Sequence, residues 1–446
     1  MTTFLATPRQ WPRVLTGRVD ALAANPADLD AAVAAGAFEG LHKTVRDLGA
    51  TGTIATIASS GLRGRGGAGF ATGEKWRASA SQATDQRYVV ANGYGADPAV
   101  GTDAALLRAD PWAVIEGLVI AAFATGATEA ILAIRADDPA LVTMLDGAVL
   151  ATEEAGFAGD DVLGTGHAVH LRVRPVQGAW MLGEETVLLK ALEGKRGQPE
   201  QKPPYPTERG LFGKPTVVNN VQTLAAVPWI IREGGPAFAA IGSKGSPGTI
   251  LVHLRGPAGG GIAEVPLGTP LRELVTLAGG TGSRALKAIL VGGPTGGLLP
   301  AELLDTPYEF EALRAAGAHV GSGSVVIADD RACVVDLARL LTRFSADQAC
   351  GKTIPCRIGL RRLYEIGDRI AAGRPRPTDA TLMTDLAHDI AASGLCDHER
   401  LATLPFTSGM RYFRSEIDDH ILRSTCPAGV CQPIVVAAGA AHRDPA

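Results

Sequence analysis

A glycine-rich stretch, Gly61 to Trp76, carries the clearest chemical signal in this chain of 446 residues. Its glycines let the backbone approach a ligand closely, and Arg63, Arg65 and Lys75 supply positive charge. A helix that begins near Thr72 would add backbone amide donors to the same place. The stretch therefore predicts a phosphate-binding site, although similar glycine patterns also occur in ordinary surface turns.

Cysteines supply the second signal, because five of the six lie between residues 350 and 431. Residues 1–18 show no apolar segment behind a basic start, so we expect no secretory signal. Clustered cysteines then favour metal or iron–sulfur ligation over disulfides. Cys333 stands apart, inside an apolar pattern typical of a helix. Cys426 and Cys431 could form a zinc site, be completed by a partner subunit, or bind no metal.

The net charge is only −4, with acidic and basic residues intermixed, which argues against nucleic acid or a membrane surface as partner. Apolar residues make up 46% of the chain, enough for real hydrophobic cores. The length predicts roughly two to four domains. The longest apolar stretch, residues 114–133, is interrupted by Glu116, Glu129 and glycines. We therefore expect a buried helix and strand there, no membrane insertion, and a cytoplasmic location.

Strands and helices alternate from about residue 46 to residue 235. The expected strands cover residues 88–91, 130–134 and 168–173, and the expected helices cover residues 111–124 and 139–154. This alternation implies a mostly parallel sheet with both faces covered, which binds ligands at the carboxyl ends of its strands. Asn92 directly follows the first strand and therefore lies at such an end.

Four further motifs follow the glycine loop along the chain. They are Gly183-Glu184-Glu185-Thr186, Glu193-Gly194-Lys195-Arg196-Gly197, Lys202-Pro203-Pro204 and Val218-Asn219-Asn220-Val221. In this order the motifs resemble the FMN- and NADH-binding flavoprotein subunit of respiratory complex I, a subunit type that recurs in NAD-linked hydrogenases and formate dehydrogenases. The resemblance extends to about residue 422.

The resemblance implies an α/β fold with a Rossmann-like FMN and NADH domain, a small β-grasp (SLBB-type) domain and a C-terminal four-helix bundle with an iron–sulfur site. Short expected strands at residues 249–254, 289–291 and 325–327, then helical apolar spacing, agree with that order. The domain boundaries that follow are a helical extension (1–45), the FMN and NAD(P)H-binding domain (46–240), the β-grasp domain (245–328), the helical iron–sulfur domain (330–422) and a cysteine-containing tail (423–446).

The family's flavin-binding positions can be transferred to this sequence residue by residue. The FMN-binding residues would be Gly64, Arg65, Gly66, Lys75, Asn92, Gly183, Glu184, Val218, Asn219, Asn220 and Thr223. Amide and hydroxyl side chains suit this task, because a buried flavin has both donors and acceptors to satisfy. Asn219 and Asn220 could instead serve turns and caps, and Glu184 and Glu185 could be an acidic pair at a helix N-terminus.

The nucleotide would be bound by Phe70, Asp97, Glu185, Lys202 and Tyr205. The family's acidic run after Asn92 is, however, altered. Tyr94 and Gly95 replace two carboxylates, Asp97 shortens a third, and Ala78 stands where a second stacking aromatic is expected. The sequence therefore leaves the choice between NADH and NADPH open.

The family's cluster signature, Ser-Cys-Gly-Lys-Cys-Thr-Pro-Cys-Arg, has lost one cysteine here. Three cysteines remain, Cys350, Cys356 and Cys396, while Thr353 occupies the position of the fourth ligand. Three thiolates can hold a 4Fe-4S cluster whose last iron has another ligand, or a 3Fe-4S cluster. The alternative is that the cluster is lost.

The resemblance implies an FMN-dependent NAD(P)H dehydrogenase subunit. Electrons would pass from NAD(P)H through FMN to the iron–sulfur cluster and a ferredoxin-like partner, and no side chain needs to act as an acid or base in the hydride step. Two alternatives remain, a stand-alone ferredoxin reductase and a non-catalytic scaffold or relay subunit that has lost nucleotide binding.

Overall fold

The computed structural model describes residues 4–431 and divides into two compact units. The first unit runs to His253 and includes Ile262–Thr269, and the second comprises Leu254–Gly261 and the chain from Pro270 onward. The expected tail from residue 423 is described as far as Cys431, and the rest of it lies outside the described residues. No helix within residues 4–431 is both long enough and apolar enough to cross a membrane.

A four-stranded parallel sheet in the order β3-β2-β1-β4 forms the centre of the first unit. The strands are β1 (Tyr88–Asn92), β2 (Glu129–Arg135), β3 (His170–Val176) and β4 (Thr216–Asn220). The predicted parallel sheet is thus confirmed. Because all four strands run the same way, their carboxyl ends meet at one edge, and Asn92 lies opposite Asn220 there.

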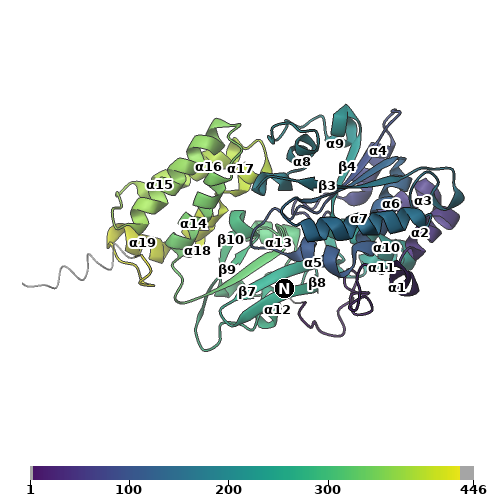
Figure 1. Ribbon diagram of the computed structural model, residues 1–446. Helices are drawn as coiled ribbons and strands as arrows, with labels where there is room; N and C mark the ends of the chain where they lie inside the picture. Colours follow the sequence, from purple (N-terminus) through teal and green to yellow (C-terminus); the bar gives the residue numbers. More distant parts are fainter. Residues whose placement is uncertain (1–3, 432–446) are drawn as a thin grey trace, which may run out of the picture. The chain divides into compact units, whose positions relative to one another are not determined.

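Helices pack on this sheet, and several of them come before its first strand in the chain (Figure 1). Their bounds are α1 (Leu29–Ala34), α2 (Glu39–Lys43), α3 (Gly49–Ser59), α4 (Thr72–Ala80), α5 (Thr102–Ala109), α6 (Pro111–Thr125), α7 (Pro139–Glu154), α8 (Glu185–Leu192), α9 (Pro206–Arg209), α10 (Val221–Glu233) and α11 (Gly235–Ala239). Helix α6 begins after Asp110, whose side chain accepts a hydrogen bond from the Ala113 amide, and ends at Gly126 in a left-handed conformation.

The later part of the chain combines a second sheet with a helical region. The five-stranded sheet has the order β10-β9-β11-β7-β8, with β7 (Thr249–Gly256), β8 (Gly259–Pro266), β9 (Leu286–Val291), β10 (Gly297–Pro300) and β11 (Ser324–Asp329). The helices are α12 (Leu271–Leu277), α13 (Phe310–Ala315), α14 (Val334–Asp347), α15 (Leu360–Ala371), α16 (Asp379–Ala392), α17 (Asp397–Leu401), α18 (Leu404–Tyr412) and α19 (Arg414–Leu422). The strands expected near residues 249, 289 and 325 are all present.

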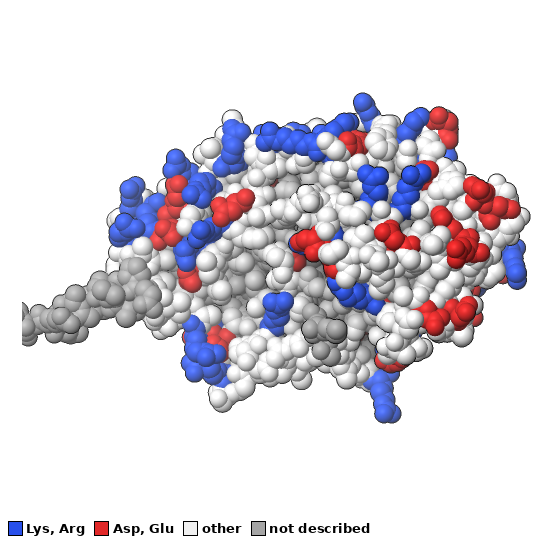
Figure 2. Space-filling view, viewed as in Figure 1, with Lys and Arg blue, Asp and Glu red and all other residues white. Residues whose placement is uncertain are grey.

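Acidic and basic side chains are intermixed on the face of the molecule that Figure 2 shows. Many exposed charges are paired with a neighbour of opposite sign, as Arg272 is with Asp305 at 2.9 Å and Arg284 with Asp330 at 2.7 Å. Exposed pairs of this kind contribute little to stability, because water and salt screen them. The mixed charge expected from the composition is therefore confirmed on this face.

Close packing of α6 against α10 depends on one glycine. A Cβ atom added at Gly117 would lie 2.0 Å from the carbonyl oxygen of Leu224. Backbone atoms cannot move aside as a flexible side chain can, so the two helices would have to separate.

We therefore predict that Gly117→Ala lowers the free energy of unfolding by about 1–3 kcal/mol or more. Gly147→Ala is the matched control, because Gly147 is exposed within α7 and a Cβ there meets nothing within 4 Å. The control should keep the wild-type stability or gain up to about 1 kcal/mol. Urea unfolding followed by circular dichroism compares the two, and equal stabilities would contradict the packing argument.

Candidate functional site

The glycine stretch forms a closed loop that leads directly into α4. The Gly64 amide donates to the Phe70 carbonyl at 2.8 Å, and the Thr72 amide donates to the Leu62 carbonyl at 2.9 Å. Gly67 and Gly69 adopt φ values of 113° and 66°, which favour glycine. The predicted helix start at Thr72 is therefore confirmed, and the loop presents its backbone beside a helix N-terminus.

Arg65 does not take the predicted role of neutralising a phosphate. Its side chain is 1% exposed, and its guanidinium donates to the carbonyl oxygens of Thr249 (2.9 Å), Pro247 (2.6 Å) and Arg63 (2.9 Å). Burial lowers the pKa of Arg65 to about 9, so the group is still charged at neutral pH. The Arg65 amide donates to the hydroxyl of Thr223 at 2.8 Å. Both residues thus fix the loop from inside.

Lys75, in the first turn of α4, reaches the carboxyl edge of the sheet. Its Nζ lies 3.0 Å from the Glu185 carboxylate and donates to the Val218 carbonyl at 3.0 Å. The same ammonium lies 5.8 Å from the centre of the Phe70 ring, which is 53% exposed. The structure therefore brings these four predicted site residues together.

Glu185 lies between two lysines. Its other carboxylate oxygen is 2.7 Å from Lys202 Nζ. Burial alone would raise the pKa of Glu185, but the charges of Lys75 and Lys202 outweigh it and lower the pKa to about 2. Burial acts to lower the pKa of Lys202, and Glu185 and Glu184 raise it to about 12. Glu185 and Lys202 are consequently both charged at neutral pH.

Glu184 caps α8, as the alternative interpretation expected, and it also contacts Lys202. One carboxylate oxygen accepts hydrogen bonds from the amides of Thr186 (2.8 Å) and Val187 (2.9 Å), which open α8. The other oxygen lies 3.1 Å from Lys202 Nζ. Gly183 precedes this cap, and a Cβ there would lie 3.4 Å from the Cβ of Ala96.

Three predicted amide side chains lie at the carboxyl ends of β1 and β4. Asn219 accepts a hydrogen bond from the Trp76 indole at 2.9 Å. Asn220 caps α10 and donates to Asp103 at 2.7 Å, so the capping alternative holds for this residue. Asn92 accepts from the Tyr94 amide at 3.1 Å.

Two other predicted nucleotide contacts are placed differently from each other. The Tyr205 side chain is 52% exposed just before α9. Asp97 is only 3% exposed and accepts a hydrogen bond from the Ala99 amide at 2.9 Å. Tyr94 is 2% exposed and packs over Arg135 at the end of β2, 5.3 Å from ring centre to guanidinium. The surface at this edge is therefore open near the aromatic rings and closed near Asp97.

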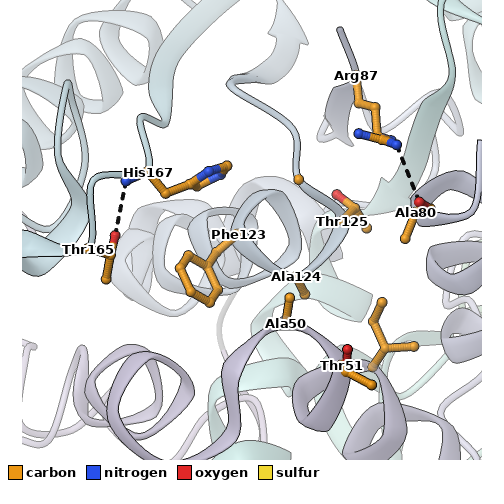
Figure 3. Close-up of a pocket in the computed structure, with 11 residues that line it drawn as sticks. Ala50, Thr51, Ala80, Arg87, Phe123, Ala124, Thr125, Thr165 and His167 are labelled. Atoms are coloured by element: carbon orange, nitrogen blue, oxygen red, sulfur yellow. Dashed lines mark hydrogen bonds between the residues drawn. The ribbon is translucent and has the colours of Figure 1, made fainter. Parts of the chain in front are cut away.

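A separate pocket of about 480 Å³ lies at the opposite edge of the same sheet (Figure 3). Its lining residues are Ala50, Thr51, Ile54, Ala80, Arg87, Phe123, Ala124, Thr125, Gly126, Thr165 and His167. Arg87 donates to the Ser79 and Ala80 carbonyls, and His167 Nε2 lies 3.3 Å from the Ala127 carbonyl. Since Arg87 and His167 precede β1 and β3, this pocket lies away from the carboxyl edge, where parallel sheets bind ligands.

One of the predicted cluster residues, Thr353, contacts a carboxylate that the sequence did not single out. Thr353 donates to Glu399 at 2.9 Å, and the Leu395 amide donates to the other oxygen of Glu399 at 2.8 Å. Glu399 is 1% exposed. Burial raises the pKa of Cys356 to about 12, and Glu399, Cys396 and Cys350 add to the shift. The only sequence signal for Glu399 was an acidic residue three positions after Cys396.

A second group of metal-ligand side chains was anticipated only in part, because the sequence offered Cys426 and Cys431 as possible zinc ligands but did not connect them with Cys333 or His420. Cys333, His420, Cys426 and Cys431 place one ligand atom each within 4.8 Å of one another. The sequence pattern predicted that Cys333 lies inside a helix. It is instead the N-cap residue of α14. No disulfide joins any of the six cysteines, all of which lie in the described part of the chain.

Two family models match this chain. The Nuo51 FMN-binding domain matches residues 57–229, and the NADH-ubiquinone oxidoreductase-F iron-sulfur binding region matches residues 336–420. The HndC subunit of an NADP-reducing hydrogenase from Solidesulfovibrio fructosivorans is 38% identical over 92% of this chain and 84% of its own length. The F subunit of the NADH-quinone oxidoreductase from Streptomyces coelicolor is 39% identical over 87% of each chain.

The chain belongs to the family of flavoprotein subunits that these two family models and these relatives represent. Its members bind FMN and an iron–sulfur cluster, so the predicted cofactors and the assignment as an oxidoreductase that takes electrons from NADH are confirmed. A solved NAD⁺-reducing [NiFe]-hydrogenase in the H2-reduced state covers 100% of this chain with a TM-score of 0.82 at 29% identity, and this chain covers 73% of that one.

Proposed function

We propose that this chain is the NAD(P)H-oxidising component of a larger cytoplasmic electron-transfer enzyme. When bound, FMN would supply the chemistry that links two-electron hydride acceptance from a nicotinamide to the release of single electrons. A ferredoxin-like partner would receive them. The observation that carries the proposal is the closed glycine loop beside Lys75 at the carboxyl edge of a parallel sheet. We also propose the five-part domain division given above, with a β-grasp domain and a four-helix iron–sulfur bundle.

The residues at this edge fit the groups of FMN. The backbone of Gly64 and Gly66 and the N-terminus of α4 suit a phosphate, and the Lys75 ammonium supplies a positive charge. Asn92, Gly183, Glu184, Val218, Asn219 and Asn220 would surround the rest of the flavin, while Arg65 and Thr223 support the loop from below. These side chains would bind and orient FMN, and none of them needs to transfer a proton.

The nucleotide would lie over the exposed aromatic rings of Phe70 and Tyr205. Glu185 and Lys202 would contact its ribose and phosphate groups, since both are charged and lie beside Lys75. The carboxylate of Asp97 is buried and accepts a hydrogen bond from the Ala99 amide. Asp97 would therefore shape the loop beside the nucleotide and would not contact the nucleotide directly.

The cluster would be held by Cys350, Cys356 and Cys396. Thr353 and the buried Glu399 would face the remaining position with oxygen atoms. Oxygen is a harder ligand than sulfur, so the metal on that side should be bound less firmly. A chain that has lost nucleotide binding and serves as a scaffold is the competing hypothesis, because Tyr94, Ala78 and Thr353 all depart from the family pattern.

We predict that the purified chain, reconstituted with FMN, shows flavin absorption that NADH bleaches. Lys75→Ala should weaken FMN binding about tenfold or more, because a hydrogen bond to a charged group contributes on the order of 1.5–3 kcal/mol. Lys214→Ala is the control, since Lys214 pairs only at the surface with Asp85 at 2.6 Å. Fluorescence titration with FMN measures both. Equal affinities would place the phosphate elsewhere, and a chain that never binds FMN would support the scaffold.

Nucleotide choice should be weak, because Gly95 stands where the family has a carboxylate that would repel a 2′-phosphate. We predict that Gly95→Glu restores preference for NADH over NADPH, seen as a higher ratio of kcat/KM values. Gly95 has a φ of 59°, so any side chain there costs about 1–2 kcal/mol. Gly95→Ala carries the same backbone cost without the charge and is the matched control. A wild-type chain already strict for NADH would refute this explanation.

The cluster should be sensitive to oxygen and should interconvert between four-iron and three-iron forms. Thr353→Cys should bind the fourth iron more firmly, because a thiolate replaces a hydroxyl. Thr353→Ser is the control, since it keeps the hydroxyl that faces Glu399. Anaerobic iron counting with electron paramagnetic resonance tests all three proteins. If none holds iron after reconstitution, the cluster assignment to these residues is wrong.

A further inference from the structure

The Cys333, His420, Cys426 and Cys431 side chains form a compact group in the second unit. Cys333 Sγ lies 3.7 Å from Cys431 Sγ and 3.4 Å from His420 Nε2. Cys431 Sγ lies 3.5 Å from the same nitrogen. With Cys426, all four ligand atoms lie within 4.8 Å of one another. Three of the four side chains are buried, and Cys426 is partly exposed.

These distances match the edges of a zinc tetrahedron. Zn²⁺ binds sulfur at about 2.3 Å and nitrogen at about 2.0–2.1 Å, so tetrahedral geometry separates two sulfurs by about 3.8 Å and a sulfur from a nitrogen by about 3.6 Å. The observed separations of 3.7, 3.4 and 3.5 Å lie close to these values. A disulfide would instead require a sulfur separation of about 2.05 Å. A four-iron cluster binds its ligands on separate irons, farther apart than ligands that share one ion.

The histidine ring is held in an orientation that suits a metal ligand. His420 Nδ1 lies 2.7 Å from the Glu416 carbonyl oxygen, which can only accept a hydrogen bond. Nδ1 must therefore carry a proton, and Nε2 is the ring nitrogen that faces the sulfurs. Glu416 is itself fixed, because its carboxylate pairs with Lys287 at 2.6 Å and accepts from the Val334 amide at 3.0 Å.

The ligands come from three places in the chain. Cys333 caps α14, where the Asp336 amide approaches its sulfur at 3.5 Å. His420 lies in the last turn of α19, and Cys426 and Cys431 follow that helix. Four protein ligands fill a tetrahedron and leave no position for substrate, which is the pattern of structural zinc.

We propose that Cys333, His420, Cys426 and Cys431 bind one Zn²⁺ in a closed structural site. Binding displaces the protons of the three thiols and leaves the imidazole neutral. This site shares no residue with Cys350, Cys356 and Cys396, and it does not depend on the proposed electron path. The metal joins the start of α14 to the segment that follows α19.

Metal counting on the full chain, purified anaerobically, tests the proposal. The wild type should contain about one zinc per chain, or take it up when zinc chloride is added. Cys426→Ser should lose that zinc and keep its iron, and the matched variant Cys350→Ser should lose iron and keep zinc. Zinc loss from both variants, or iron loss from Cys426→Ser alone, would overturn the separate site.

A spectroscopic measurement on the wild type does not depend on whether a variant folds. Co²⁺ added to the apoprotein should give thiolate charge-transfer absorption and the strong visible bands of a tetrahedral ion, and Zn²⁺ should bleach both. An octahedral cobalt spectrum, or no binding of either ion by the reduced chain, would refute the proposal.

Discussion

The carboxylate of Glu185, held between Lys75 and Lys202, is the interaction on which the candidate flavin site depends. It joins the first turn of α4, the first turn of α8 and the loop before α9, and Lys75 extends the connection to the Val218 carbonyl on β4. A charge in such a place is costly unless it is paired, so removing one partner leaves the others unsatisfied. These ion pairs fix helix α4, which follows the glycine loop. A loop held in this way would be able to approach a phosphate closely.

Local sequence patterns were sufficient to predict much of the fold. The alternation of apolar strands and helices predicted the parallel sheet, and the glycine run predicted a helix start at Thr72. Long-range partners could not be predicted in the same way. Arg65 looks like a phosphate ligand in the sequence, but its guanidinium is satisfied by carbonyls of Pro247 and Thr249, more than 180 residues away.

The same limit applies to metal ligands. Cys350 and Cys356 are recognised by their spacing within one loop, whereas Cys333 and His420 are 87 residues apart and share no local motif. Glu399 was overlooked because acidic residues in the first turn of a helix, such as Asp397 and Glu399 in α17, usually serve only the helix dipole. Its burial and its hydrogen bond to Thr353 distinguish it, and both are properties of the folded chain.

Helix α14 separates the two groups of cysteines in the helical region, with one group at each of its ends. Cys333 caps its first turn, and Cys350 follows shortly after its end at Asp347. Its 14 residues span about 21 Å at 1.5 Å per residue, too far for the two sets of cysteines to exchange ligands. A metal at the Cys333 end would fix the N-terminus of the helix whose other end leads into the cluster loop. The proposed Cys3His site would thus hold this helical region in place, while the oxygen atoms of Thr353 and Glu399 would make the proposed cluster site chemically labile.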